Sequence, residues 1–230
     1  MTTTDFAGTR ACVFDAYGTL FDFNAAVARC RDEVGPQADR LSALWRDKQI
    51  QYTWLRSLMG RYAPFWQVTG EALDYCLETL AITKPALRDR LMAAYRELDA
   101  FPEVPAVLDS LKAAGYPLAI LSNGSPEMLD AAVNAARLGD RLDAVLSVAE
   151  VSIFKPHPSV YKLAVDRLGV PAETICFLSS NAWDAAGAAA FGFRVVWINR
   201  GRLPAERLPD GPRATIATLA ELPALLGVAA

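Results

Sequence analysis

Several kinds of sequence are missing from this chain, and each absence argues against a class of protein. No apolar run is long enough to span a bilayer, so no membrane span is predicted. The first eight residues contain neither a basic n-region nor an apolar h-region, and we expect no signal peptide. With 23 basic and 26 acidic residues, a net charge of −3, the chain lacks the basic surface typical of nucleic-acid-binding proteins.

Cysteine and histidine are also scarce. The four cysteines, Cys12, Cys30, Cys76 and Cys176, are scattered and form no Cys-x-x-Cys pair, so neither disulfides nor a zinc site are predicted. We expect a reduced, cytoplasmic protein. The one histidine, His157, lies between two prolines, which favours an exposed side chain over a general base.

What the chain does contain is an alternation of strands and helices. Its 230 residues, 53% of them hydrophobic, suit one large domain or a core with an insertion. Runs rich in Val, Ile and Leu predict buried parallel strands over 11–14, 118–121, 144–148, 174–178 and 195–198. Helical patterns lie near 103–114, 126–137, 158–168, 182–191 and 218–226. This order predicts an α/β fold with a Rossmann-like, doubly wound parallel sheet.

Residues 23–98 interrupt the alternation. They contain no convincing strand but long stretches with helical spacing, which predicts an inserted helical cap subdomain, with 1–22 plus 99–230 forming the core. The turn bearing Asp15 would then lie under the insertion, with a pocket between the two parts. One predicted apolar stripe of the cap consists of Leu41, Leu44, Trp45, Lys48, Tyr52, Leu55 and Leu58 or Met59.

Asp15 stands at the end of the first predicted strand, where open α/β sheets place their chemistry. Its carboxylate is either a covalent nucleophile or a structural group that ties down a turn. Gly18 permits a close backbone approach. Thr19 offers a hydroxyl and an N–H to the carboxylate, or simply caps a helix. Tyr17, two positions after Asp15, stands where a second acid could have been.

Polar residues also follow two later strands. Ser122 and Asn123 could bind a substrate carboxylate through side-chain and N–H groups, or form a turn before a helix. Lys155 lies in a Lys-Pro loop, where proline restricts the backbone, although a lone lysine is more often solvated. Tyr161, one turn into the next helix, can donate a hydrogen bond to a carboxylate.

A last polar group follows the strand at 174–178. Asp184 can pair with Lys155, which would leave Asp15 ionised, and can also orient a water molecule. Ser179 and Asn181 precede it at the same strand end. A tryptophan is more often part of a core than of a site, but Trp183, between Asn181 and Asp184, is expected to wall the pocket.

This order of residues, on a core interrupted by a helical cap, resembles the haloacid dehalogenase (HAD) superfamily over nearly the whole chain. The residues that carry the resemblance are Asp15, Thr19, Ser122, Lys155 and Asp184. Most members are magnesium-dependent phosphatases with Asp-x-Asp-x-Thr and Gly-Asp-x-x-x-Asp motifs. Here Tyr17 replaces the second aspartate of the first motif, and Ser179-Ser180 begin the second. Because Mg²⁺ requires carboxylate oxygens, we expect no metal and no cofactor.

The motifs Asp-x-Tyr-Gly-Thr, Ser-Asn, Lys-Pro-x-Pro-x-x-Tyr and Ser-Ser-Asn-x-Trp-Asp, with a cap arginine, are similar to those of the 2-haloacid dehalogenases of the L-2-haloacid type. The resemblance implies that Asp15 attacks C2 of a short (S)-2-haloacid. Halide leaves, and water then hydrolyses the aspartyl ester to give an (R)-2-hydroxyacid with inversion at C2. Chloride and bromide leave without a proton, so no second acid is required.

The same resemblance implies the other roles. The substrate carboxylate would rest on Ser122 and Asn123, helped by Thr19. Lys155 would assist the attack of water, held in place by Tyr161, Ser179 and Asp184. The halogen would be surrounded by Arg46, Asn181, Tyr17, Phe65 and Trp183.

Two alternatives stay open: a HAD-superfamily phosphatase acting on a small phosphate ester, and a catalytically inactive binding module. The expected partners are a 2-haloalkanoate and halide, with neither nucleic acid nor membrane. A homodimer is possible through the apolar segment Trp54, Leu55, Leu58 and Met59.

Overall fold

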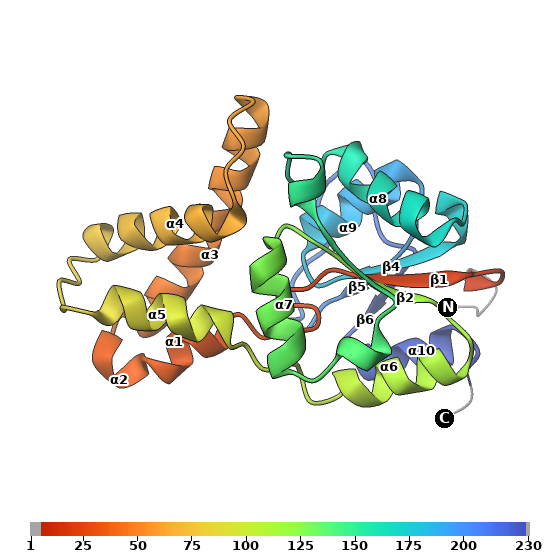
Figure 1. Cartoon of the computed structure of the whole chain (residues 1–230), viewed down its shortest axis with the longest axis horizontal. Coiled ribbons are helices and arrows are strands. Elements are labelled where there is room, and N and C mark those ends of the chain that lie inside the picture. The colour runs from red at the N-terminus through yellow and green to blue at the C-terminus, as the bar shows by residue number, and fades with distance from the viewer. Residues whose placement is uncertain (1–5, 229–230) are drawn as a thin grey trace.

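The computed structural model describes residues 6–228, which form a six-stranded parallel sheet flanked by helices and a separate group of helices to one side (Figure 1). Residues 1–5, which are part of the segment predicted to contain no signal peptide, lie outside the described residues. The strands are β1 (Ala11–Phe14), β2 (Leu118–Ser122), β3 (Ala144–Ser147), β4 (Ile175–Ser179), β5 (Arg194–Ile198) and β6 (Ala214–Ile216), in the order β3-β2-β1-β4-β5-β6. The predicted fold class is therefore confirmed.

Burial explains why the strands could be recognised. All residues of β1, β2 and β4 are buried, as expected for a parallel sheet covered on both faces. In the register, Val13 of β1 lies between Ala119 of β2 and Phe177 of β4. The five predicted strands are confirmed to within a residue, but β6 was missed. It has only three residues, lies at the sheet edge and alternates buried with exposed, so it gives no apolar run.

The helices of the core follow the strands as predicted. In Figure 1, α8 and α9 lie on one face of the sheet, and α6 and α10 lie on the other. The α-helices of this part are α6 (Val104–Ala113), α7 (Pro126–Ala135), α8 (Pro158–Leu168), α9 (Ala182–Phe191) and α10 (Leu222–Leu225). Single 3₁₀ turns occur at η2 (Gly139–Arg141), η3 (Val148–Glu150), η4 (Ala172–Thr174) and η5 (Leu219–Glu221).

Between β1 and α6 the described chain forms five helices and no named strand. They are α1 (Ala25–Arg29), α2 (Arg31–Val34), α3 (Ala38–Leu58), α4 (Phe65–Thr79) and α5 (Leu87–Arg96), on the left of Figure 1. The outgoing and returning chains are joined by hydrogen bonds from Asp22 N to Asp99 O (3.1 Å) and from Phe101 N to Leu20 O (2.9 Å). We call these helices the helical unit. The exact domain bounds, 23–98 against 1–22 plus 99–230, stay a prediction.

The apolar stripe predicted along α3 is right in its first half and wrong in its second. The buried residues of α3 are Ala38, Leu41, Trp45, Gln49, Ile50 and Thr53. Leu58 and Met59 are instead 85% and 63% exposed. The buried face continues with helical spacing through Gln49 and Thr53, polar residues with hydrogen bonds inside the protein. The prediction followed apolar residues only, so beyond Trp45 it named residues of the neighbouring, more exposed face.

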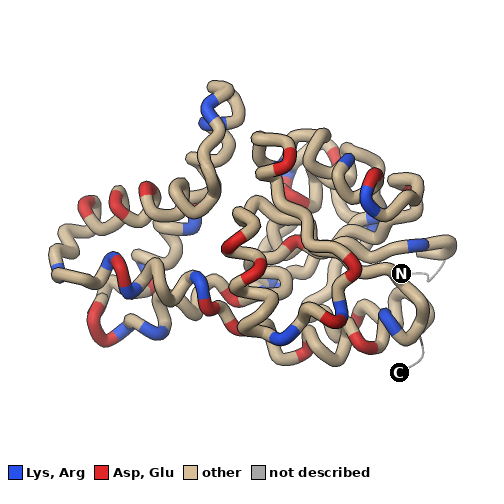
Figure 2. The backbone as a smooth tube through the Cα atoms, in the orientation of Figure 1, with Lys and Arg blue, Asp and Glu red and all other residues tan. Residues whose placement is uncertain are grey.

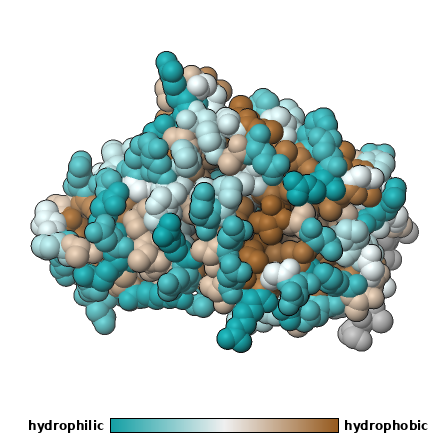
Figure 3. All heavy atoms as spheres, viewed as in Figure 1, coloured by the Kyte–Doolittle hydropathy of each residue, from teal (hydrophilic) through white to brown (hydrophobic). Residues whose placement is uncertain are grey.

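Charged residues of both signs are spread over the described surface. Lys and Arg alternate with Asp and Glu along both the core and the helical unit (Figure 2). On the face shown in Figure 3, hydrophobic residues are more evident over the core than over the helical unit. Within residues 6–228, no helix combines the length and the apolar character needed to cross a membrane. The four cysteines are all buried and unpaired.

Candidate active site

The strand order brings the predicted site residues to one edge of the sheet. β1 lies between β2 and β4, and the chain winds away from it in opposite directions, which opens a crevice at the carboxyl ends of these strands. Asp15 follows β1, and Asn181 follows β4. Lys155 comes from the loop between β3 and α8. The Asp15 amide donates to Leu178 O at 2.8 Å, which ties the β1 turn to β4.

The Asp15 carboxylate is the centre of this cluster and is 6% exposed. Its Oδ1 accepts a hydrogen bond from Lys155 Nζ at 3.1 Å. Its Oδ2 accepts one from Asn181 Nδ2 at 2.7 Å, with the hydroxyls of Thr19 and Ser179 each 3.4 Å away. Donors from the β1 turn, the β3–α8 loop and the β4–α9 loop therefore fix both oxygens of one buried carboxylate.

Lys155 lies between two carboxylates. Its Nζ is 3.1 Å from Asp15 Oδ1 and 2.9 Å from Asp184 Oδ2, and the side chain is 1% exposed. Burial by itself lowers the pKa of Lys155, but the charges of Asp15 and Asp184 outweigh it and raise this pKa above its ordinary value. Lys155 is therefore a fixed ammonium across the neutral range.

Asp184 is completely buried and receives a second donor besides Lys155. Tyr161 Oη donates to Asp184 Oδ1 at 2.7 Å. Burial raises the pKa of Asp184, while the charge of Lys155 acts in the opposite direction. Burial and the neighbouring Asp184 charge raise the pKa of Tyr161 well above its usual value, so this phenol stays a donor. Tyr161 thus binds a carboxylate, as its position in α8 predicted.

The donor set does not suit a divalent cation. Magnesium needs several oxygen ligands in octahedral geometry, but the space between Asp15 and Asp184 is taken by the Lys155 ammonium. Tyr17 contributes a phenol where a metal-dependent relative would have a carboxylate. Among the residues that the structure describes, no group of three or more His, Cys, Asp or Glu side chains could hold a metal.

The turn after β1 leaves no space for a side chain at Gly18. Its φ is +87°, and a Cβ there would be 2.7 Å from Ser180 Oγ and 3.1 Å from the Phe23 ring. Thr19 accepts a hydrogen bond from Ser180 N at 2.8 Å, so it links the β1 and β4 turns. Thr19 is not a helix cap, because the next helix, α1, has Asn24 at that position.

The residues after β2 use their side chains within the protein. Ser122 Oγ accepts from Gly124 N at 3.1 Å, and Asn123 Oδ1 accepts from Lys155 N at 3.0 Å. Asn123 therefore fixes the loop that carries Lys155, a contact that sequence reasoning did not foresee. Ser125 occupies the N-cap position of α7 without a side-chain capping bond. That Ser122 and Asn123 bind a substrate carboxylate stays a prediction.

Arg46 brings the helical unit into contact with this cluster. From α3, its Nη2 donates to Asn181 Oδ1 at 3.0 Å and its Nη1 to Gln49 Oε1 at 2.7 Å. The guanidinium carbon lies 4.8 Å from the centre of the Phe23 ring. Asn181 thus binds Arg46 through its oxygen and Asp15 through its nitrogen.

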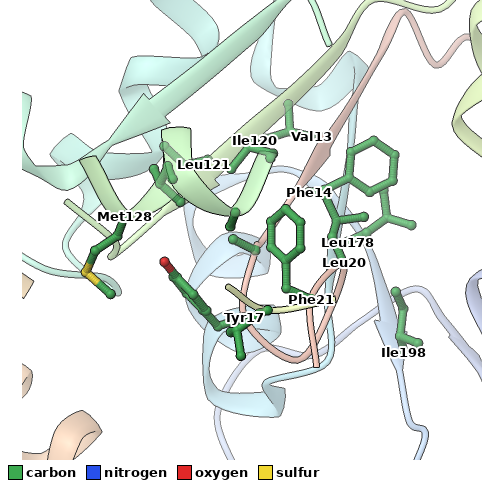
Figure 4. Close-up of a cluster of buried hydrophobic side chains, with 14 of the residues drawn as sticks. Val13, Phe14, Tyr17, Leu20, Phe21, Ile120, Leu121, Met128, Leu178 and Ile198 are labelled. Atoms are coloured by element: carbon green, nitrogen blue, oxygen red, sulfur yellow. The ribbon is translucent and has the colours of Figure 1, made fainter. Parts of the chain in front are cut away.

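Aromatic rings enclose the other side of the turn. Tyr17 is 3% exposed and belongs to the buried cluster of Figure 4, which includes Phe21 and Met128. Its ring centre lies 6.1 Å from that of Phe65 and 5.6 Å from that of Tyr95. A Cβ at Gly124 would be 2.9 Å from the Tyr17 ring, so this ring packs directly on the β2 turn. Burial raises the pKa of Tyr17 well above its usual value.

The ring of half-buried Trp183 meets Trp54 of α3 edge-on at 5.4 Å, at the junction of the helical unit and the core, and its role as a wall of the pocket stays a prediction. Some predicted contacts differ from those observed. Tyr161 and Ser179 were predicted to hold Lys155, but they donate to Asp184 and Asp15. His157 is exposed, as predicted.

Sequence reasoning gave no role to four residues around the cluster, Phe23, Gln49, Tyr95 and Ser180, although Ser180 belongs to a motif that it did recognise. Gln49 offered a usable signal. It lies one helical turn after Trp45, on the face that buries Leu41 and Trp45, and a polar residue there predicts an internal hydrogen bond. Phe23 and Tyr95 offered none, because their positions depend on how the helices pack.

Comparison with known proteins assigns the class. A family model described as haloacid dehalogenase-like hydrolase matches residues 9–192. The chain belongs to this family. It is 51% identical over 218 residues (94% of this chain and 96% of the relative) to (S)-2-haloacid dehalogenase 1 of Pseudomonas sp. (strain CBS-3). It is 54% identical over 198 residues (86% of each chain) to (S)-2-haloacid dehalogenase 4A of Burkholderia cepacia.

Solved structures agree with this. An L-2-haloacid dehalogenase from Xanthobacter autotrophicus, with chloropropionic acid covalently bound, superposes with a TM-score of 0.89 at 37% identity, covering 96% of this chain and 100% of that one. The resemblance drawn from the motifs is thereby confirmed.

Proposed function

We propose that this protein hydrolyses short (S)-2-haloacids to (R)-2-hydroxyacids and halide. The observation that carries the proposal is the Asp15 carboxylate, which is buried, held by Lys155 and Asn181, and followed by Tyr17 where a metal-dependent enzyme would have an acid. The relatives named above act on the same class of compound.

In the first step, one Asp15 oxygen attacks C2 of the substrate from the side opposite the halogen. The new C2–O bond forms as the carbon–halogen bond breaks, and halide leaves with its electron pair. Negative charge moves from Asp15 to the halogen. Arg46, positioned by Asn181, stabilises that charge, and the Tyr17 and Phe65 rings limit access of water to the nucleophile.

In the second step, water attacks the ester carbonyl of Asp15. The water oxygen becomes part of the carboxylate as the bond between the carboxyl carbon and the ester oxygen on C2 breaks. The departing oxygen takes up one proton of the water, the other proton is released, and the hydroxyacid leaves with its configuration inverted once. The donors around Asp15 then stabilise the tetrahedral oxyanion. Asp184, held by Lys155 and Tyr161, shares the Lys155 ammonium with Asp15 and accepts a proton of the attacking water, which it passes to the departing oxygen.

Two assays test this proposal. The first measures halide release from (S)-2-chloropropionate, with the (R) enantiomer as control, and the expected product is (R)-lactate. The second is a single turnover in ¹⁸O-water with enzyme in excess, which should place the label in the Asp15 carboxylate, as measured by peptide mass spectrometry. Label found directly in lactate would rule out the ester. Magnesium-dependent phosphate release without halide release would support the phosphatase alternative, and neither activity would support the binding module.

We also propose a homodimer through the end of α3. Trp54, Leu55, Leu58 and Met59 are all exposed, and Leu58 and Trp54 line a groove of about 460 Å³ with Ile153 and Pro158. An apolar patch next to an apolar groove is typical of an interface between two copies. Light scattering should give twice the chain mass, and Leu58→Glu should return it to the monomer.

The cytoplasmic location stays a prediction from the sequence. Cell fractionation with an antibody against the chain tests it.

A further inference from the structure

Gln49 is a buried polar residue of α3 with no part in the mechanism given above. Its side chain is 1% exposed, although an amide transferred from water without partners is costly. It forms hydrogen bonds to three side chains, Arg46, Thr69 and Tyr95. A fully bonded buried amide fixes the orientation of whatever it contacts.

The direction of these bonds is determined on the α4 side. Thr69 Oγ1 donates to Phe65 O at 2.8 Å, so its proton is already engaged. Thr69 can then only accept, and Gln49 Nε2 donates to it at 2.8 Å. Tyr95 Oη lies 3.2 Å from the same nitrogen and 3.4 Å from Gln49 Oε1, so it can pair with either atom. The bond to Thr69 therefore decides the orientation and places the amide nitrogen of Gln49 towards α4.

The carbonyl of Gln49 then faces Arg46. A guanidinium can only donate, so Gln49 Oε1 is the matching acceptor at 2.7 Å from Arg46 Nη1. The other terminal nitrogen of Arg46 donates to Asn181 Oδ1, and Asn181 Nδ2 donates to Asp15 Oδ2. A chain of hydrogen bonds thus connects α4 to the candidate nucleophile, and Arg46 donates in both directions along it, through Gln49 towards α4 and through Asn181 towards Asp15.

We propose that Gln49 is a positioning residue for Arg46 and that it holds the guanidinium where negative charge develops on the departing halogen. Arg46 is a long, half-buried side chain, and Gln49 and Asn181 each bond one of the two terminal nitrogens of its guanidinium, so loss of Gln49 would free one of them. A guanidinium held in place stabilises a developing charge better than a mobile one. The inference rests on the dehalogenase function proposed above.

The test compares two glutamines of the same helix. Gln49→Met keeps the shape and removes the bonds. It should lower kcat for (S)-2-bromopropionate about tenfold, with KM changed less than about twofold, because the restraint matters most as halide leaves. Gln51→Met is the matched control: Gln51 is exposed and bonds Lys48, so its kcat should be that of the wild type.

A double-mutant cycle separates positioning from a general packing defect. In an Arg46→Ala background, where no guanidinium remains to be held, Gln49→Met should change kcat by less than about twofold. An equal loss in both backgrounds, or no loss in the wild-type background, would overturn the inference. If Gln49→Met does not fold, as judged by circular dichroism, the isosteric Gln49→Glu takes its place. Its effect on kcat must likewise disappear without Arg46.

The two proposals fail in different ways. A wild-type protein that releases no halide ends the proposed function. A wild-type protein that dehalogenates normally, with a Gln49→Met kcat that is unchanged or lowered independently of Arg46, ends only the role of Gln49.

Discussion

The core and the helical unit contribute different kinds of group to the candidate site. From the core come charges: Asp15, Lys155 and Asp184 are almost completely buried and bonded to one another in a row. From the helical unit comes Arg46, which is half-buried and bonds the neutral amides of Asn181 and Gln49.

In the proposed mechanism, this difference divides the two steps of the reaction between the two parts. The proposed nucleophile and its partners depend on loops at the edge of a parallel sheet, so their distances are set by the fold itself. The group proposed to receive the halide depends on how a helix packs against the core. Substitutions at the charged residues of the core should therefore abolish turnover, whereas substitutions in the helical unit should lower kcat without abolishing it.

The most damaging change should be Asp15→Asn. The amide is a far weaker nucleophile than a carboxylate, so halide release should fall by at least about 10⁴-fold. Lys155 keeps Asp184 as a partner, so the fold should persist. Halide release and circular dichroism measured on the same sample check this. More than about one per cent of wild-type activity would exclude Asp15 as the nucleophile.

Lys155→Met should come next, and it should also cost stability. It leaves two buried carboxylates facing each other, which should lower the free energy of unfolding at pH 7 by about 3–5 kcal/mol and kcat by about 10³-fold. Burial already raises the pKa of Asp184 and the charge of Lys155 opposes this, so without the ammonium the folded-state pKa of Asp184 should rise further above its unfolded value. The lost stability should then return as the pH falls through this raised value. Urea unfolding at pH 7 and pH 5 measures this, and a constant difference would contradict it.

Arg46→Ala should separate chemistry from folding. Removing the donor for the halogen should lower kcat about 100-fold, while the midpoint of thermal unfolding should change little, because a half-exposed arginine contributes about 1 kcal/mol or less. Stopped-flow halide release and thermal unfolding give the two values. If the loss is no larger for chloride than for the better leaving group bromide, Arg46 does not act on the halogen.

Trp183→Leu should have the smallest effect. Its edge-on contact with Trp54 joins α9 to α3, and such aromatic pairs contribute about 0.5–1.5 kcal/mol. We expect a modest loss of stability and a KM raised a few-fold, with kcat retained. Tyr75→Leu, on the exposed side of α4, serves as a control for loss of a ring. A large fall in kcat would show that Trp183 acts in the chemical step and does more than line the pocket.

The sequence alone was sufficient to predict that the three charged residues of the core belong to one site. Asp15, Lys155 and Asp184 lie far apart in the chain, but each follows a predicted parallel strand, and such strand ends meet at one edge of the sheet. The pairing of Lys155 with Asp184 could therefore be predicted. Only the family resemblance placed Arg46 at the site.

The remaining details depend on the packing of helices, which periodicity does not determine. The stripe predicted for α3 failed beyond Trp45, because Gln49 and Thr53 continue the buried face with polar atoms. The contact between Trp183 and Trp54 depends on how α3 packs against the core, and no local sequence pattern predicts that packing. β6 was missed because three residues at a sheet edge need no apolar run.

The absence of a side chain at Gly18 has a consequence for redesign. A methyl group there would collide with Ser180 and Phe23, so position 18 cannot be varied without moving the turn that carries Asp15 and Thr19, and redesign has to act on other residues. The aromatic side chains of Tyr17, Phe65 and Tyr95 are the residues to replace by smaller ones, and two of them belong to the helical unit. Variants for larger substrates can therefore be made largely in the helical unit, without changing the charged residues of the core.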